Sequence, residues 1–248
     1  MSRKRETPLR DESIDPGHCS PGLRSRILAG TRYFGDLSPE ALDEVNTHFR
    51  EQHHKAGAVI CNEGAKATRL FLVAHGNVKL MRHSPEGDDV LLDILPQGAL
   101  FGGVAPLGQS TYAETAVAHT ECCVLAITAD AFEKLLARHP PVALEVLHSV
   151  AEDLDDARST IRRLATASVE ARIATVLLAL AERLGETDEA GVLIQSPLPQ
   201  QDLAAMVGAT QETVSRVMAA FRRSELVSSG RQWVRILDTG ALEKISGT

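Results

Sequence analysis

The chain has 248 residues, a formal net charge of −7 and 44% hydrophobic residues, which allows one large domain or two small ones. This composition is typical of a soluble globular protein, and no apolar run approaches the roughly 18 residues of a membrane-spanning helix. The charged start MSRKRETPLRDES has no apolar core, so we expect no signal peptide and a cytoplasmic location. The negative net charge excludes indiscriminate coating of nucleic acid but allows a local basic reading surface.

The N-terminal part of the chain predicts a tail followed by a helix. Residues 1–24 are rich in Pro, Gly, Ser and charge and lack an apolar period, so we expect a mobile tail there. The segment LSPEALDEVNTHF then predicts a helix, because Ser38 suits the N-cap and Pro39 suits the first helical position. The apolar stripe of this helix comprises Leu42, Val45 and Phe49.

Between Gly57 and Ile127 the pattern changes to short runs of β-forming residues. The runs are AVICNEG, RLFLVAHGNVKLMRHSPEGDDVLLDIL, QGALFGG and TAVAHTECCVLAI, with turn signals such as His-Gly, Pro-Glu-Gly and Gln-Gly among them. Short strands at this spacing predict an antiparallel sandwich or roll. We therefore place an antiparallel β domain at residues 25–138.

A long helical stretch follows, broken at Pro140 and Pro141. Within it, apolar residues recur alternately four and three positions apart, as they do in a helix that packs against a second helix. These positions are Ala143, Leu147, Val150, Leu154, Ala157, Ile161 and Leu164. About three heptads are few for this pattern, so packing of the helix on its own domain is the alternative. We assign residues 139–167 as a dimerisation helix, and its wholly apolar seam predicts a permanent dimer.

The last part of the chain, residues 168–248, predicts a helix, a loop, two short helices and a hairpin. The segment QQDLAAMVGATQETVSRVMAAFRRSEL fits a helix-turn-helix, in which Pro199 and Gln200 open the first helix and Thr210 caps the second. The helix-crossing, turn and core positions are Leu203, Ala204, Val207, Gly208, Val214 and Val217. The following LVSSGRQWVRIL predicts two strands around a Ser-Gly turn, a wing that is able to touch phosphate.

The second short helix carries side chains that suit base readout. Glu212 is able to accept a hydrogen bond from cytosine N4, and the guanidinium of Arg216 is able to fork onto guanine O6 and N7. An ordinary solvated helix is the alternative, because residues 168–248 hold eight Lys and Arg against ten Asp and Glu. The predicted DNA-binding residues are Thr210, Gln211, Glu212, Thr213, Ser215, Arg216, Arg222 and Arg231.

This order of elements, with GATQETVSRVMAAF and NEGAKATRLFLVAHGNVKLMRHSPEG, resembles the catabolite-activator/fumarate-nitrate-regulator (CRP/FNR) superfamily of bacterial transcription regulators. The resemblance runs from about Ile27 to Ile245. It implies an α+β fold with an N-terminal cyclic-nucleotide-binding-type antiparallel β-roll, a long dimerisation helix and a C-terminal winged helix-turn-helix. It also implies a homodimer on a palindromic double-stranded DNA site, and RNA polymerase as the partner of an activator. Glu212, Ser215 and Arg216 match members that read TTGA-type half-sites.

Two classes of function are not expected from the residues present. No nucleophile elbow, phosphate-binding loop, dinucleotide fingerprint or His-Glu-x-x-His pattern occurs, so we expect no enzyme. Cyclic-AMP members of the superfamily carry a Gly-Glu pair and an Arg-Ser pair, because a cyclic phosphate needs a cation and oriented donors. Here Gly103 stands in place of the Glu, and Tyr112 and Ala113 stand in place of Arg-Ser, so we do not expect cyclic AMP to bind.

The cysteines do not suit an iron–sulfur cluster. Members that bind a [4Fe–4S] cluster use three closely spaced tail cysteines and a fourth in the roll. Here the tail holds only Cys19, and the roll position is Leu125, two residues beyond Cys123. Cys61, Cys122 and Cys123 lack C-x-x-C spacing and are expected to be free thiols. Because adjacent strand residues point to opposite faces, we expect one of the paired cysteines to be buried and the other exposed.

The dissimilatory-nitrate-respiration (DNR-type) branch also lacks both ligand sets, and resemblance to it implies a b-type haem that responds to nitric oxide. Haem needs an apolar slot and an axial ligand such as a neutral histidine. The candidate pocket residues are Phe101, Gly102, Gly103, Val104, Tyr112 and Glu114. The candidate ligands are His18, His53, His54, His75 and His119, each of which is more simply an ordinary structural or surface histidine. A ligand-independent regulator with a filled roll and a thiol-based redox sensor are the alternatives.

Overall fold

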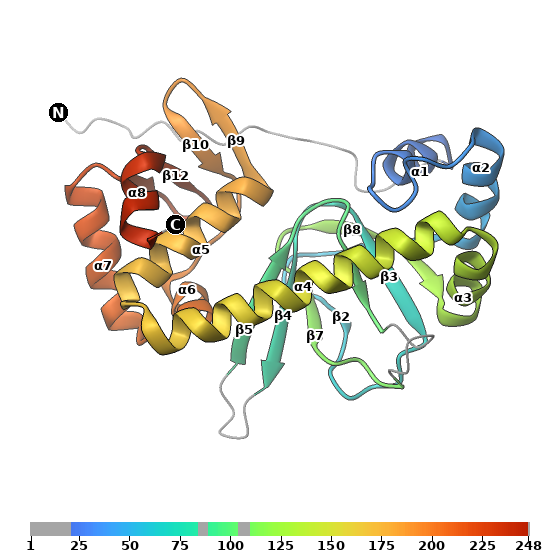
Figure 1. Ribbon diagram of the computed structural model, residues 1–248, viewed down its shortest axis with the longest axis horizontal. Helices are drawn as coiled ribbons and strands as arrows, with labels where there is room; N and C mark the ends of the chain where they lie inside the picture. The colour runs from blue at the N-terminus through green and yellow to red at the C-terminus, as the bar shows by residue number, and fades with distance from the viewer. Residues whose placement is uncertain (1–20, 84–88, 104–109, 248) are drawn as a thin grey trace. The chain divides into compact units, whose positions relative to one another are not determined.

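The computed structural model of the chain describes residues 21–83, 89–103 and 110–247 (Figure 1). The chain forms two compact units, one ending at Arg162 and the other running from Arg163 to the C-terminal end. Three residues named above, His18, Cys19 and Val104, lie outside the described residues. Within the described ranges, no helix has the length and apolar character needed to cross a membrane.

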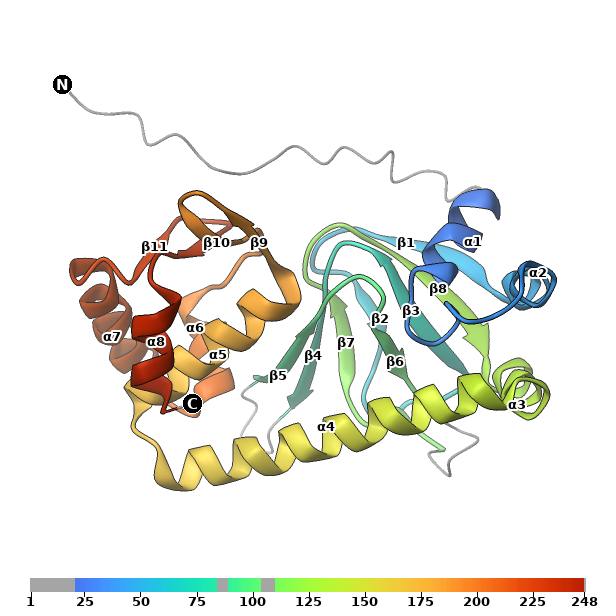
Figure 2. The same cartoon turned by 45° about the horizontal axis from the view of Figure 1, so that its top comes forward.

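Two four-stranded antiparallel sheets build the N-terminal unit (Figure 2). One has the strand order β1-β8-β3-β6 and the other has the order β2-β7-β4-β5. The strands are β1 (Arg50–His54), β2 (Val59–Cys61), β3 (Arg69–His75), β4 (Val78–His83), β5 (Asp89–Leu95), β6 (Leu100–Gly102), β7 (Thr115–Ala118) and β8 (Cys122–Thr128). This arrangement is the β-roll that the short apolar runs and the family resemblance predict.

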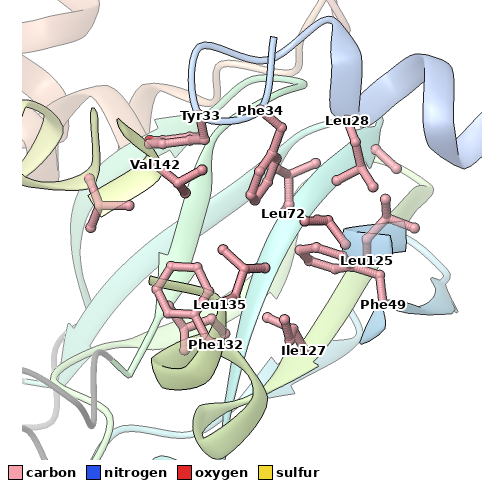
Figure 3. Packing of buried hydrophobic residues seen from close by; sticks show 14 of the residues in the cluster. Leu28, Tyr33, Phe34, Phe49, Leu72, Leu125, Ile127, Phe132, Leu135 and Val142 are labelled. Atoms are coloured by element: carbon pink, nitrogen blue, oxygen red, sulfur yellow. The ribbon is translucent and has the colours of Figure 1, made fainter. Parts of the chain in front are cut away.

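Strand β8 is apolar and buried from Cys122 to Ile127 because both of its faces are covered. Alternate residues of a strand point to opposite faces. Leu125 and Ile127 therefore pack against residues of the helices, among them Phe132 (Figure 3). Val124 and Ala126 instead join a second buried cluster inside the roll. The roll is thus a two-sided core built on one central strand.

The helices of this unit cover one sheet face. They are α1 (Pro21–Ala29), α2 (Pro39–His48), α3 (Ala129–Arg138) and α4 (Pro140–Thr166), the last of which continues past Arg162. The hydroxyl of Ser38 accepts a hydrogen bond from the Ala41 amide at 3.3 Å, which confirms the predicted cap of α2. Phe34 and Phe49 meet edge to face with ring centroids 5.8 Å apart, and both are fully buried (Figure 3).

Two elements of the N-terminal unit differ from the sequence-based expectation. Helix α1 begins at Pro21, so residues 21–24 are helical and are not part of a tail. Strand β1 has the polar sequence REQHH and shows no apolar alternation. It is an edge strand that pairs with β8, where Gln52 lies opposite Val124. The strand is thus formed by backbone pairing with β8, which no local pattern reveals.

The C-terminal unit packs helices against one small sheet of strand order β11-β12-β10-β9. Its core includes Ile173, Leu177 and Phe221, each almost fully buried. The elements are α5 (Val169–Leu184), β9 (Gly185–Asp188), β10 (Gly191–Ile194), α6 (Gln200–Val207), α7 (Gln211–Arg223), β11 (Val227–Ser229), β12 (Val234–Ile236) and α8 (Thr239–Ser246). Helices α6 and α7 with the β11–β12 hairpin form the predicted winged helix-turn-helix.

The loop expected after α5 is in fact the β9–β10 hairpin, and α8 is an element that the sequence pattern does not predict. Strand β10 pairs with β12, so this hairpin extends the sheet of the wing. The buried Arg235 on β12 forms an ion pair with the exposed Asp188 on β9. This contact across the sheet is long-range in the chain, which explains why local patterns miss the hairpin.

Candidate nucleic-acid interface and sensor roll

The turn between α6 and α7 depends on a glycine and a threonine. Gly208 has the left-handed values φ 59° and ψ 50°, and its amide donates to the carbonyl of Ala204. A glycine adopts this conformation at little cost. Thr210 then caps α7, because its hydroxyl accepts from the Thr213 amide at 3.3 Å. The predicted turn and cap are both present.

Helix α7 has one buried face and one exposed face. Val214, Met218 and Phe221 pack in the core of the unit. Gln211, Glu212 and Arg216 are exposed on the other side, while Ser215 and Thr213 are half-buried. A shallow hollow follows this face and is lined by Gln200, Gln211, Glu212, Ser215, Arg216 and Ala219. The predicted readout residues therefore lie together on one accessible surface.

The wing lies next to the C-terminal end of α7. The guanidinium of Arg222 donates to the hydroxyl of Ser229 on β11 at 3.2 Å, which joins the helix to the hairpin. Arg231, at the tip of the hairpin, is exposed. Gln200 is a site residue that the sequence analysis misses, although it lines the hollow at the N-terminal end of α6. Its place as the first residue of α6 is the sequence signal that could have indicated it.

Helix α4 exposes an apolar stripe. Leu154 and Ile161 leave 51% and 68% of their surface open to solvent, which is unusual for large apolar side chains. Every predicted seam residue from Leu147 to Leu164 is exposed in the single chain: Leu147, Val150, Leu154, Ala157, Ile161 and Leu164. The stripe has no covering within the described chain.

The other side of α4 is used within the N-terminal unit. Val142 and Val146 are buried in the core beside the helices. The Tyr33 hydroxyl lies 3.1 Å from that of Ser149, and Arg32 pairs with Glu152. These contacts use residues of α4 other than those of the apolar stripe. They argue against the alternative that the stripe packs on its own domain.

The described part of the candidate sensor pocket is filled by side chains. The rings of Phe71 and Phe101 stack with centroids 5.2 Å apart, and the ring of Tyr112 lies beside Phe71. The Tyr112 hydroxyl donates to the carbonyl of Arg69 at 3.2 Å. A Cβ at Gly103 would lie 2.1 Å from the Cβ of Ala67. A glutamate at position 103 would therefore clash with Ala67 in this packing, and Tyr112 offers a hydroxyl bonded to Arg69 where a cyclic-nucleotide site has a cation.

Glu114 and Gly102 complete the described pocket residues. Gly102 has φ 104°, and a Cβ there would meet the ring of Phe71 at 3.1 Å. The pKa of the half-buried Glu114 carboxyl is raised by burial, and Arg82 partly offsets this effect. Arg82 also pairs with Glu63 at 3.5 Å. Glu114, Arg82 and Glu63 thus form a small group of neighbouring charges in the roll.

We expect Gly103→Ala to destabilise the N-terminal unit by about 1–3 kcal/mol, because the added methyl group overpacks the contact with Ala67. Urea unfolding of the variant measures this loss. Gly30→Ala is the matched control, since a Cβ there meets its nearest atom at an ordinary 3.4 Å. Equal stability of the two variants would show that the roll has space at Gly103.

The described histidines proposed as haem ligands lie on or next to strands of the roll. His53 and His54 are on the edge strand β1, His75 ends β3 and His119 follows β7. The Nε2 atom of His53 lies 4.0 Å from the Cys123 sulfur, and the pKa of His54 is lowered by burial. Among the described residues, no group of three or more His, Cys, Asp or Glu is placed to hold a metal ion. The haem hypothesis therefore stays a prediction, and none of these histidines is singled out as its ligand.

The adjacent cysteines correct one expectation. Cys122 and Cys123 are both buried, with 2% and 4% of their surface exposed, whereas strand alternation predicts that one is exposed. They do point to opposite faces, Cys122 into the roll and Cys123 toward the helices. Both are buried because β8 is covered on both sides. Burial also raises the pKa of the Cys61 and Cys122 thiols to about 11.

We expect Cys61 and Cys122 to react slowly with iodoacetamide at pH 8 in the folded protein. With pKa values of about 11, only about one thiol in a thousand is in the reactive thiolate form. Mass spectrometry of timed samples, with urea-unfolded protein as the fast reference, measures the rates. Comparable rates in folded and unfolded protein would favour the thiol-based redox sensor.

These features define the class of protein: a two-domain regulator with a cyclic-nucleotide-binding-type roll and a winged helix-turn-helix. Residues 51–139 match the family model of the cyclic nucleotide-binding domain, and residues 171–245 match that of the Crp-like helix-turn-helix domain. The Cyclic AMP receptor protein of Thermus thermophilus is 30% identical over 219 residues, which cover 88% of this chain and 98% of that protein. The chain therefore belongs to the CRP/FNR family of DNA-binding transcription regulators, which are not enzymes.

Other relatives agree with this assignment. The CRP-like cAMP-activated global transcriptional regulator of Mycobacterium tuberculosis is 27% identical over 210 residues, which cover 85% of this chain and 91% of that protein. The crystal structure of a CRP-family transcriptional regulator from Thermus thermophilus is similar, with a TM-score of 0.66 and 27% identity. The match covers 79% of this chain and 97% of that structure. The DNR-type branch is not distinguished by these relatives.

Proposed function

We propose that the chain regulates transcription as a homodimer that binds an inverted repeat of TTGA-type half-sites through helix α7. The observation that carries this proposal is the exposed polar face of α7, with Glu212 and Arg216 side by side along one hollow. A helix presented in this way by a helix-turn-helix enters the major groove with its N-terminal residues against base edges. RNA polymerase is the proposed partner at promoters that the protein activates.

The side chains in the hollow suit the proposed half-site. The Arg216 guanidinium would donate two hydrogen bonds to guanine O6 and N7, and the Glu212 carboxylate would accept from the N4 amine of cytosine. Thr210 and Thr213 lie at the N-terminal end of α7, where backbone amides and the helix dipole favour a phosphate. Arg222 and Arg231 would contact the backbone from the wing side. Phosphate contacts position the domain, and base contacts specify the sequence.

The apolar stripe of α4 is proposed to pair with the same stripe of a second copy. Its a/d spacing, exposure and lack of charge suit a parallel two-helix seam. Two-fold symmetry then requires an operator with two half-sites related by inversion, about 34 Å apart. Any signal at the roll would shift the dimer between arrangements that do and do not match this spacing.

For the signal, the packing of the roll favours a ligand-independent regulator over one that senses nitric oxide through haem. Phe71, Phe101 and Tyr112 are buried together in the roll, and the rings of Phe71 and Phe101 stack. The Mycobacterium tuberculosis relative is named as a cAMP-activated regulator. We propose that it does not act here, because Gly103 and Tyr112 offer the cyclic phosphate no cation.

The test measures DNA binding by fluorescence anisotropy on a TTGA palindrome and on a scrambled duplex of the same composition. We expect at least about a thousand-fold preference for the palindrome at physiological salt. The measurement is repeated with cyclic AMP, and with haem and nitric oxide while the absorption spectrum is recorded. An unchanged affinity and no haem absorption band support the ligand-independent regulator. Tighter binding with either ligand would overturn that part of the proposal.

A further inference from the structure

Arg172, near the start of α5, joins three parts of the C-terminal unit. One terminal nitrogen of its guanidinium donates to the carbonyls of Leu164 and Ala167 at 3.2 Å each. The other donates to the carbonyl of Gly208 at 3.4 Å. Leu164 lies in the last turn of α4, and Gly208 is the turn glycine before α7. A single side chain therefore bonds to both the end of the dimerisation helix and the helix-turn-helix.

The chemistry of these contacts suits a fixed connection. The last carbonyls of a helix carry partial negative charge, so a guanidinium there is favourable. The Arg172 side chain is half-buried, and its Nε atom is shielded from solvent without a hydrogen-bond partner among the described residues. Burial of an unpaired donor costs free energy. The hydrogen bonds of the two terminal nitrogens offset this cost and hold the guanidinium in place.

Packing joins the same two points independently of these hydrogen bonds. A Cδ atom of Leu164 lies 3.0 Å from the position that a Cβ at Gly208 would occupy. Leu164 is also the last apolar residue of the seam, with 45% of its surface exposed. The end of the seam therefore contacts the turn that sets the direction of α7.

We propose that Arg172 is a positioning residue that fixes the end of the α4 seam to the Gly208 turn, so that a dimer presents its two α7 helices at one spacing. The proposal rests on the proposed function, because it needs a dimer on a two-half-site operator. Without Arg172 each helix-turn-helix would still read a half-site. The second half-site would then be found less often, because the effective concentration of the second reading helix falls.

The experiment compares parent, Arg172→Met and Arg172→Lys on three duplexes: the TTGA palindrome, a single half-site and a scrambled sequence. Methionine keeps the apolar stem and removes every donor, whereas lysine keeps a charge that bonds some of the carbonyls. Arg183→Met, an exposed position in the last turn of the same helix, is the matched control.

We expect Arg172→Met to bind the half-site like the parent but to lose about ten-fold affinity for the palindrome, with Arg172→Lys in between. The control should match the parent on both. If Arg172→Met loses the same affinity for the palindrome and for the half-site, Arg172 only stabilises the domain. If it loses affinity for neither duplex, Arg172 has no positioning role. Both results overturn the proposal. If the parent protein binds the palindrome no more tightly than the scrambled duplex, the proposed function is overturned instead. The parent protein alone gives this result, before any variant is made.

Discussion

A glutamate in place of Leu154 is expected to turn the proposed dimer into monomers. Leu154 lies at the middle of the α4 stripe and is 51% exposed in the single chain, so the substitution does not disturb the core of either unit. In a paired seam, each lost leucine forfeits about 2 kcal/mol of burial, and the symmetric dimer loses two. Two carboxylates facing each other across an apolar seam add repulsion and desolvation. A loss of about 4 kcal/mol or more corresponds to at least about a thousand-fold weaker dimer.

Sedimentation equilibrium measures the dimer constant, and anisotropy measures the consequence for DNA. The monomeric variant should bind a single half-site like the parent and lose its extra affinity for the palindrome. Leu144→Glu is the matched control: Leu144 is 57% exposed on the same helix but lies outside the a/d positions. If both variants stay dimeric, the stripe is not the interface. If both dissociate equally, the a/d assignment is wrong.

The features that repeat along the chain could be predicted from the sequence. The apolar spacing along α4 and the turn of the helix-turn-helix follow local rules of spacing, capping and glycine conformation. The structure has the turn and an exposed apolar stripe on α4, and the pairing of that stripe in a dimer stays a prediction. Strand β1 and the β9–β10 hairpin obey no such rule, because pairing with distant strands forms them. The same distinction explains the cysteines. Alternation along β8 predicts opposite faces, but only the packing of the helices on one side and of β7 and β4 within the roll shows that both faces are covered.

The sensor side was less predictable for a physical reason. The sequence shows that Gly103 replaces a glutamate. It does not show that a Cβ at this position would lie 2.1 Å from the Cβ of Ala67, because the two residues are 36 positions apart in the chain. The stacking of Phe71 on Phe101 is likewise a contact between strands β3 and β6. The sequence therefore shows that the ligand-binding glutamate and arginine of the cyclic-AMP members are missing from the roll. Packing shows what occupies the space instead.

Arg216→Ala is expected to lower affinity for the TTGA palindrome by about 1–3 kcal/mol per half-site, or about 2–6 kcal/mol for a symmetric dimer. Arg216 is exposed and lines the hollow, so thermal unfolding should be unchanged. Because the proposed role of the guanidinium fork is to read guanine, the variant should also stop distinguishing duplexes in which that base pair is exchanged. Arg216→Lys should lose most of the same discrimination, since an ammonium group makes no fork.

The salt dependence of binding separates this role from a general electrostatic one. A base contact leaves the slope of log affinity against log salt nearly unchanged, whereas loss of a phosphate contact reduces it by about one per contact. Arg231→Ala at the wing is therefore the matched control: it should weaken binding to all sequences alike and flatten the slope. If Arg216→Ala behaves in the same way, α7 holds the backbone and the readout assigned to it is wrong. If only Arg216→Ala relaxes the guanine preference, the hollow along α7 is the reading surface, because both variants remove the same charge from the same domain.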